Sequence, residues 1–215
     1  VKGLAFLLLL ISPLLAATAQ AEVSSLEIVP EYPAQGDVVS IRISAQPKEN
    51  ISVIIAFSKT LSVVDGGYEW ILDDVHVPSK SNRVTVRASN VVNVKVAVKI
   101  FLWITQTVTA SEGTATISRG DIPVGTYDIR IRGDATPVAS KVTLDVTAST
   151  TLMMDAEGNY EFSYNTSNIP LGTFRVEAGA IKKTVNLNEK GSSPPPARAE
   201  LEIRDLRVYP QVSTE

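Results

Sequence analysis

Apolar and polar residues alternate along much of the chain with the two-residue period of a β-strand. Residues 38–44 read VVSIRIS, in which aliphatic residues take every second position from Val39. The same alternation recurs in residues 83–88, 127–132 and 141–147. Because successive side chains of a strand point to opposite faces, this pattern predicts strands with one face in a core and one in water. No stretch of a dozen residues shows a helical period, so we expect an all-β protein.

A repeated motif organises these strands. A glycine opens a strand that ends in Ile-Pro or Val-Pro, and a Gly-x-aromatic-x-aliphatic segment follows. Copies begin at Gly67, Gly113 and Gly158, and the first copy lacks the second half. Because proline cannot donate to a strand ladder and glycine permits a tight reversal, the motif predicts three hairpins.

Three hairpins with additional strands between them fit two small domains. We expect tandem immunoglobulin-like β-sandwich domains at residues 22–108 and 109–188, each near the usual size. The boundary has an alternative, in which residues 103–111 form one strand shared between sheets. Residues 189–199 contain GSSPPPA, which is typical of a linker, and residues 200–215 are expected to start a truncated third β domain.

Composition supports the same fold class. Val, Thr and Ile together make up 61 of the 215 residues, and hydrophobic residues make up 44%. β-branched side chains suit a pleated sheet, and this apolar content excludes a disordered chain. The absence of cysteine excludes disulfide scaffolds, thiolate metal sites and cysteine nucleophiles.

The first 21 residues predict a signal peptide. Lys2 precedes the apolar run Leu4–Leu15, and Ala19-Gln20-Ala21 is a small-x-small cleavage site. An uncleaved N-terminal anchor is the alternative. The other apolar run, residues 91–103, contains two lysines and predicts one long strand, not a membrane span.

The net charge of the chain limits the classes of partner that it can bind. The chain has a net charge of −3, and removal of Lys2 with the leader leaves −4. A mildly acidic chain without a basic cluster excludes nucleic acid and lipid headgroups as partners. We therefore expect a membrane link only through an anchor outside this segment.

The motif resembles the immunoglobulin-like repeats of archaeal S-layer and other cell-surface proteins. The residues that carry the similarity are Gly36–Ile41, the Gly-x-aromatic strands and the Ile-Pro-x-Gly-x-aromatic returns, between about residues 24 and 188. Residues 201–212 resemble the first strand of a cell-adhesion-related surface domain of bacteria and archaea. The resemblance implies an extracellular, modular protein with no catalytic residues to carry over.

These observations predict a non-enzymatic structural or adhesive protein of the cell surface. Its expected partners are other surface proteins, copies of itself or glycans. The alternative is a glycan- or protein-binding accessory module of a larger exported protein or enzyme.

The chain offers few residues for chemistry. His76 is the single histidine, so a zinc site with two histidines is impossible, and nothing singles out a serine for a triad. Asp155, Glu157 and Asn159 surround Gly158 and are candidate calcium ligands. A hairpin turn explains the same residues without an ion. A second acidic cluster joins Asp73 and Asp74 to Asp65.

Two sequons are candidate glycosylation sites, and three aromatic residues are candidates for carbohydrate binding. Asn50 and Asn165 each begin an Asn-x-Ser sequence and are candidate glycosylation sites. Trp70 and Trp103, with Tyr68, have the chemistry of a carbohydrate-stacking platform. Core positions for both tryptophans are the alternative that we favour.

Overall fold

The computed structural model describes residues 22–77, 81–167 and 169–192. These residues form thirteen β-strands that pair in antiparallel ladders, which confirms the predicted all-β class. In chain order the strands are β1 (Val23–Val29), β2 (Val38–Ala45), β3 (Asn50–Ser62), β4 (Gly67–Val77), β5 (Asn82–Ser89), β6 (Asn93–Lys99), β7 (Trp103–Thr109), β8 (Thr114–Gly120), β9 (Gly125–Asp134), β10 (Lys141–Met153), β11 (Asn159–Asn165), β12 (Gly172–Ala178) and β13 (Ile181–Leu187).

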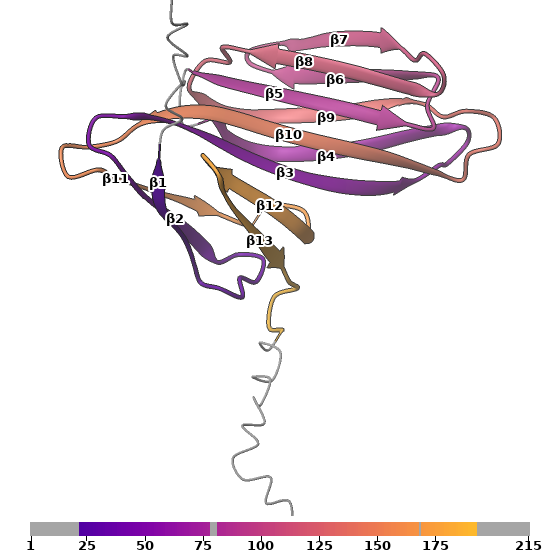
Figure 1. Cartoon of the computed structure of the whole chain (residues 1–215). Coiled ribbons are helices and arrows are strands. Elements are labelled where there is room, and N and C mark those ends of the chain that lie inside the picture. Colours follow the sequence, from indigo (N-terminus) through magenta and orange to yellow (C-terminus); the bar gives the residue numbers. More distant parts are fainter. Residues whose placement is uncertain (1–21, 78–80, 168, 193–215) are drawn as a thin grey trace, which may run out of the picture.

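The strands form three sheets, which Figure 1 shows. A three-stranded sheet has the order β1-β2-β11, and a four-stranded sheet has the order β4-β9-β6-β7. A six-stranded sheet, in the order β13-β12-β3-β10-β5-β8, lies against both. The predicted strands at 38–44, 83–88, 127–132 and 141–147 lie within β2, β5, β9 and β10.

Two long strands are common to both halves of the molecule. β3 and β10 have 13 residues each and pair along their whole length, from Ser62 with Lys141 to Asn50 with Met153. β12 pairs with one part of β3, and β5 pairs with one part of β10. One part of the six-stranded sheet therefore faces the three-stranded sheet, and another part faces the four-stranded sheet (Figure 1).

Each facing pair of sheets encloses one apolar cluster. We call the layers around the first cluster the terminal unit, because β1 and β13 belong to it. The buried residues of this cluster are Leu26, Ile28, Val39, Ile41, Ile43, Ile51, Val53, Leu152, Met154, Val176 and Ala178. Its residues come from both facing sheets, so burial of their apolar surface stabilises the stacking of the two layers.

The second cluster lies in what we call the inserted unit, since residues 63–140 separate β3 from β10 in the sequence. Its buried residues are Tyr68, Val86, Ala88, Val91, Val94, Ala115, Ile117, Ile131, Ala135, Val142, Leu144 and Val146. β10 supplies the last three of these, and it supplies Leu152 to the first cluster. One strand therefore contributes to both cores.

Pairing crosses the position at which a domain boundary was expected. Residues 108 and 109 are the last two of β7, and strands on either side pair with each other: β4 and β6 with β9, β5 with β8, and β2 with β11. Each unit therefore combines segments from both sides of that position. Periodicity identifies strand residues but does not say which strands pair.

The predicted hairpins were wrong. β4 and β5, β8 and β9, and β11 and β12 correspond to the three motif copies, yet each pair divides between two different sheets. The proline and glycine therefore mark a connection that passes from one layer to the facing layer. A proline at a strand end and a glycine at the next strand suit either kind of reversal, so the motif alone could not distinguish them.

The prediction of one long strand at 91–103 was also wrong. The segment contains β6, a turn at residues 100–102 and the first residue of β7, which pairs back onto β6. The turn consists of Ile100, Phe101 and Leu102, so it lacks the glycine, proline or asparagine that usually signals a reversal.

The predicted signal peptide, most of the linker and the third-domain strand lie outside the described residues. Within the described part of the chain, no helix has the length and apolarity needed to cross a membrane.

Candidate interaction surface

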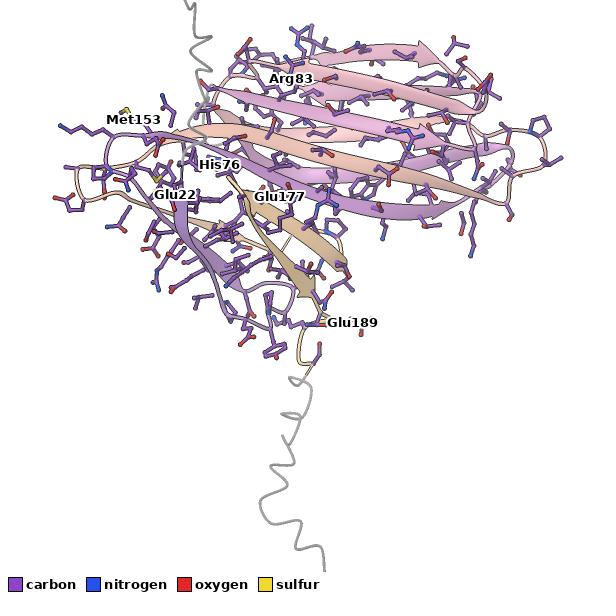
Figure 2. The ribbon with its side chains drawn as sticks, viewed as in Figure 1. Glu22, His76, Arg83, Met153, Glu177 and Glu189 are labelled. Carbon is purple, nitrogen blue, oxygen red and sulfur yellow. The ribbon has the colours of Figure 1, made fainter. Side chains whose placement is uncertain are left out.

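His76 lies on β4 where the two units meet (Figure 2). Its side chain is exposed, and its backbone N–H donates to the hydroxyl oxygen of Tyr164 on β11 at 3.0 Å. Burial raises the pKa of the Tyr164 hydroxyl, and the His76 hydrogen bond opposes that rise. This bond ties the inserted unit to the terminal unit and gives His76 a structural contact.

A hollow of about 280 Å³ adjoins this contact. Asp73, Asp74 and Tyr164 are among its lining residues. Asp74 has a φ of 54°, and the ladder between β4 and β9 shifts register between Leu72 and Val75. Asp65 lies in the turn before β4, apart from this hollow. The second acidic cluster of the sequence is therefore divided between two places.

The candidate calcium ligands lie in a turn, and two of the three, Asp155 and Asn159, accept hydrogen bonds through a side-chain oxygen. The Asp155 carboxylate accepts the backbone N–H groups of Glu157 at 3.1 Å and Asn159 at 2.6 Å. The Asn159 side-chain oxygen accepts the Ser44 hydroxyl at 2.9 Å, and Gly158 has a φ of 83°. No group of three or more His, Cys, Asp or Glu side chains in the described residues is placed to hold a metal ion. The geometry is that of an Asx-type turn.

We expect Asp155→Ala to lower the free energy of unfolding by about 1–2 kcal/mol, because two turn N–H groups lose their acceptor. The loss should be equal in calcium and in chelator if the carboxylate serves only the turn. Chemical denaturation of both proteins in both buffers measures it. A wild-type protein that gains stability in calcium, while the variant does not, would instead identify Asp155 as a cation ligand.

Both sequon asparagines are exposed. Asn50 is the first residue of β3, and Asn165 is the last residue of β11. The Asn165 side-chain oxygen accepts the Ser167 N–H at 2.8 Å, while the intervening Thr166 is buried and bonds to backbone oxygens of Ala34 and Asp37. Glycans at these positions remain a prediction.

The three aromatic candidates do not share one face. Tyr68 is buried in the inserted unit, its hydroxyl donates to the Asn93 carbonyl at 2.9 Å, and burial followed by the Asp134 charge raises its pKa. Trp70 packs on the same cluster and meets Phe57 edge-on, with ring centroids 5.8 Å apart. The core position that we favoured therefore holds for Trp70.

Trp103 is not a core residue, so that expectation was wrong for it. It is 39% exposed and pairs with Lys99 at the end of β6. The guanidinium of Arg130 lies 4.4 Å from the centroid of its ring. Arg130 precedes the buried Ile131 on β9, so Trp103 occupies the face of the sheet opposite to Tyr68 and Trp70.

An exposed apolar segment surrounds Trp103. Phe101 is 94% exposed, Leu102 is 80% exposed and Ile104 is 61% exposed. We call residues 100–104 the apolar tip. Large apolar side chains exposed together on neighbouring residues are unfavourable in water, so this segment is a candidate contact site.

β7 continues from the apolar tip as an edge strand without protection. Its sequence, WITQTVT, has no charge and no proline, and its ladder with β6 is regular. Sheet edges attract other strands, and proteins usually protect them with charges, prolines or bulges. The other five edge strands of the described sheets all carry charge, for example at Glu27 on β1, Asp73 on β4, Arg119 on β8, Glu161 on β11 and Lys182 on β13. We call β7 and the apolar tip together the β7 surface.

The sequence contained one sign of this surface. Alternation is lost at residues 100–104, where five consecutive residues are apolar. That run fits a buried strand as well as an exposed tip, so the sequence alone could not place it at an edge.

Comparison with known proteins gives no family. No protein-family model matches the chain, and neither does any curated protein or solved structure.

Proposed function

We propose that this chain is a non-enzymatic structural or adhesive module of the cell surface, built from immunoglobulin-like β-sandwich units, and that it binds protein through the β7 surface. The observation that carries the proposal is the edge strand β7, which alone among the described edges lacks charge. An extended segment of another protein can add to such an edge through main-chain hydrogen bonds.

The layered architecture supports the immunoglobulin-like part of the proposal. Each unit has two antiparallel sheets that face each other across one apolar cluster. Sandwich domains of cell-surface proteins share this arrangement. The apolar leader expected at residues 1–21 supports export, and an extracellular location follows from it.

β7 lies far from both ends of the described chain, a position that suits a strand used to bind a partner. Glu22 and Glu189 lie on the terminal unit, whereas β7 lies on the far side of the inserted unit (Figures 1 and 2). The inserted unit thus projects from the segment that carries both ends of the described chain. A partner at β7 would meet neither end.

Glycan binding is the alternative, and Trp103 is the residue that could serve it. A sugar stacks on an open aromatic face, but the Arg130 guanidinium already lies over this ring. The geometry therefore favours a protein partner. Loss of binding to purified envelope glycans in Trp103→Ala, with adhesion to protein-coated surfaces retained, would favour the glycan alternative.

The proposal is tested by adhesion of beads that carry the purified protein to envelope fragments of the source cells. Thr107→Lys places a charge on β7 and should reduce adhesion at least about tenfold, because a lysine on an edge opposes strand addition. Thr184→Lys is the matched control, since β13 is an edge strand that already carries Lys182 and Lys183. Equal adhesion of both variants and the wild type would overturn the proposed role of β7.

A further inference from the structure

We propose that the partner of β7 is β7 of a second copy, and that the two strands pair antiparallel about a two-fold axis at Gln106. This inference rests on the proposed function and names its partner. The pairing would join two four-stranded sheets into one continuous sheet. A two-fold contact uses the same surface on both copies, so a single strand must be complementary to itself.

β7 meets this requirement. With Gln106 opposite Gln106, Thr105 lies opposite Thr107, and Ile104 lies opposite Val108. Around the axis polar residues therefore meet polar residues on one face of the joined sheet, and aliphatic residues meet aliphatic residues on the other face; at the strand ends Trp103 lies opposite Thr109. Such cross-strand pairs stabilise a sheet, and like charges directly opposite would destabilise it. The strand has no charge, so the symmetric pairing brings no repulsion.

The same register covers apolar surface beyond the strand. It places Leu102 of each copy beside Ala110 of the other. Leu102 is 80% exposed, so the pairing would cover part of this side chain with the chain of the other copy. Removing its apolar surface from water favours association.

The charges near the apolar tip favour a protein over a lipid partner. Lys99 bonds to Asp128 at 3.4 Å, and Lys95 lies 3.8 Å from Asp134. Both lysines are thus matched by carboxylates on the adjacent strand β9, and Arg130 lies over the Trp103 ring. These few cations fall short of the cluster of about 4–8 basic residues that an anionic membrane attracts.

The first experiment measures the mass of the full exported chain over a range of concentrations by sedimentation equilibrium. We expect reversible dimers in the wild type. Gln106→Lys should weaken the dimer at least about tenfold, because the axis sets two lysines opposite each other. Gln106→Glu should weaken it similarly, and a mixture of the two variants should restore a dimer. That restoration requires position 106 to face itself, and a merely unfolded variant could not give it.

The second experiment uses the absence of cysteine from the chain. Gln106→Cys should form a disulfide-linked dimer on mild oxidation, since directly opposite Cβ atoms lie within disulfide reach. Thr105→Cys should cross-link with Thr107→Cys faster than with itself. Thr184→Cys on β13 is the control. Thermal melting of every variant establishes that each is folded.

The outcomes separate this inference from the proposed function. A chain that stays monomeric, with Gln106→Cys cross-linking no faster than the control, overturns self-pairing. If Thr107→Lys nevertheless abolishes adhesion, the proposed function stands with a different protein partner. A monomer that binds phosphatidylglycerol vesicles, and loses binding in Phe101→Ser, would make the apolar tip a membrane contact and overturn self-pairing as well.

Discussion

Replacing Leu144 with alanine should lower the free energy of unfolding by about 3–5 kcal/mol, with both units unfolding in one transition. Leu144 has no exposed surface and lies in the apolar cluster of the inserted unit. Its removal leaves a cavity that neighbouring layers fill only in part, so the loss includes more than the transfer of the side chain. Because β10 also supplies Leu152 to the terminal unit, loosening one core withdraws support from the other.

Chemical denaturation followed by two probes tests this result. Far-UV circular dichroism reports all strands, and tryptophan fluorescence reports Trp70 and Trp103, both in the inserted unit. Coincident curves would show one cooperative transition. Met153→Ala is the control, because Met153 lies on the same strand but is 67% exposed, and it should change stability by less than about 0.5 kcal/mol. Separate transitions for the two probes would contradict the expected coupling.

Gly158→Ala should destabilise the protein by about 2–5 kcal/mol. Gly158 has a φ of 83°, which an L-residue adopts at a cost of about 1–2 kcal/mol. A Cβ at this position would also overlap the carbonyl oxygen of Ala45, which is backbone and cannot rotate away. The backbone of Ala45 is held close to Gly158, because the Ala45 N–H donates to the Gly158 carbonyl at 2.8 Å. Overpacking against backbone adds about 1–3 kcal/mol to the conformational cost.

Gly66→Ala separates the two contributions. Gly66 has a φ of 76°, but a Cβ there would meet no heavy atom within 4 Å. It should therefore show the conformational cost alone, and the difference between the two variants measures the overlap. Thermal melting or denaturant titration gives both values. Equal losses at the two positions would show that the turn at residues 155–159 can move away from Ala45.

Strand residues were predictable because burial of one face of a strand produces a two-residue alternation of apolar and polar residues in the sequence. Ile41 and Ile43 follow this alternation, and both are buried in the terminal unit. The partners of strands were not predictable in the same way. β3 pairs with β10, from which residues 63–140 separate it in the chain, and nothing in the local pattern of either strand identifies the other.

The β7 surface could not be predicted from the sequence for a related reason. An edge strand and a central strand have the same period, so residues 103–109 gave no sign that β7 has only one neighbour. Residues 100–102 lack turn-forming residues, and their apolar character suggested continued burial. Trp103 was expected in the core because it ends an apolar run, whereas its pairing with Lys99 places it on the open face of the sheet.

The shared strands also determine how the molecule would respond to pulling. Tension applied between Glu22 and Glu189 would act first on β1 and β13, which are edge strands of the terminal unit. Residues 63–140 are connected to that unit through β3 and β10, which lie next to each other along their whole length, so the force does not run through them. The terminal unit would bear the mechanical load while the inserted unit stays relaxed. A contact made at β7 would therefore keep its geometry under strain that begins to open β1 or β13.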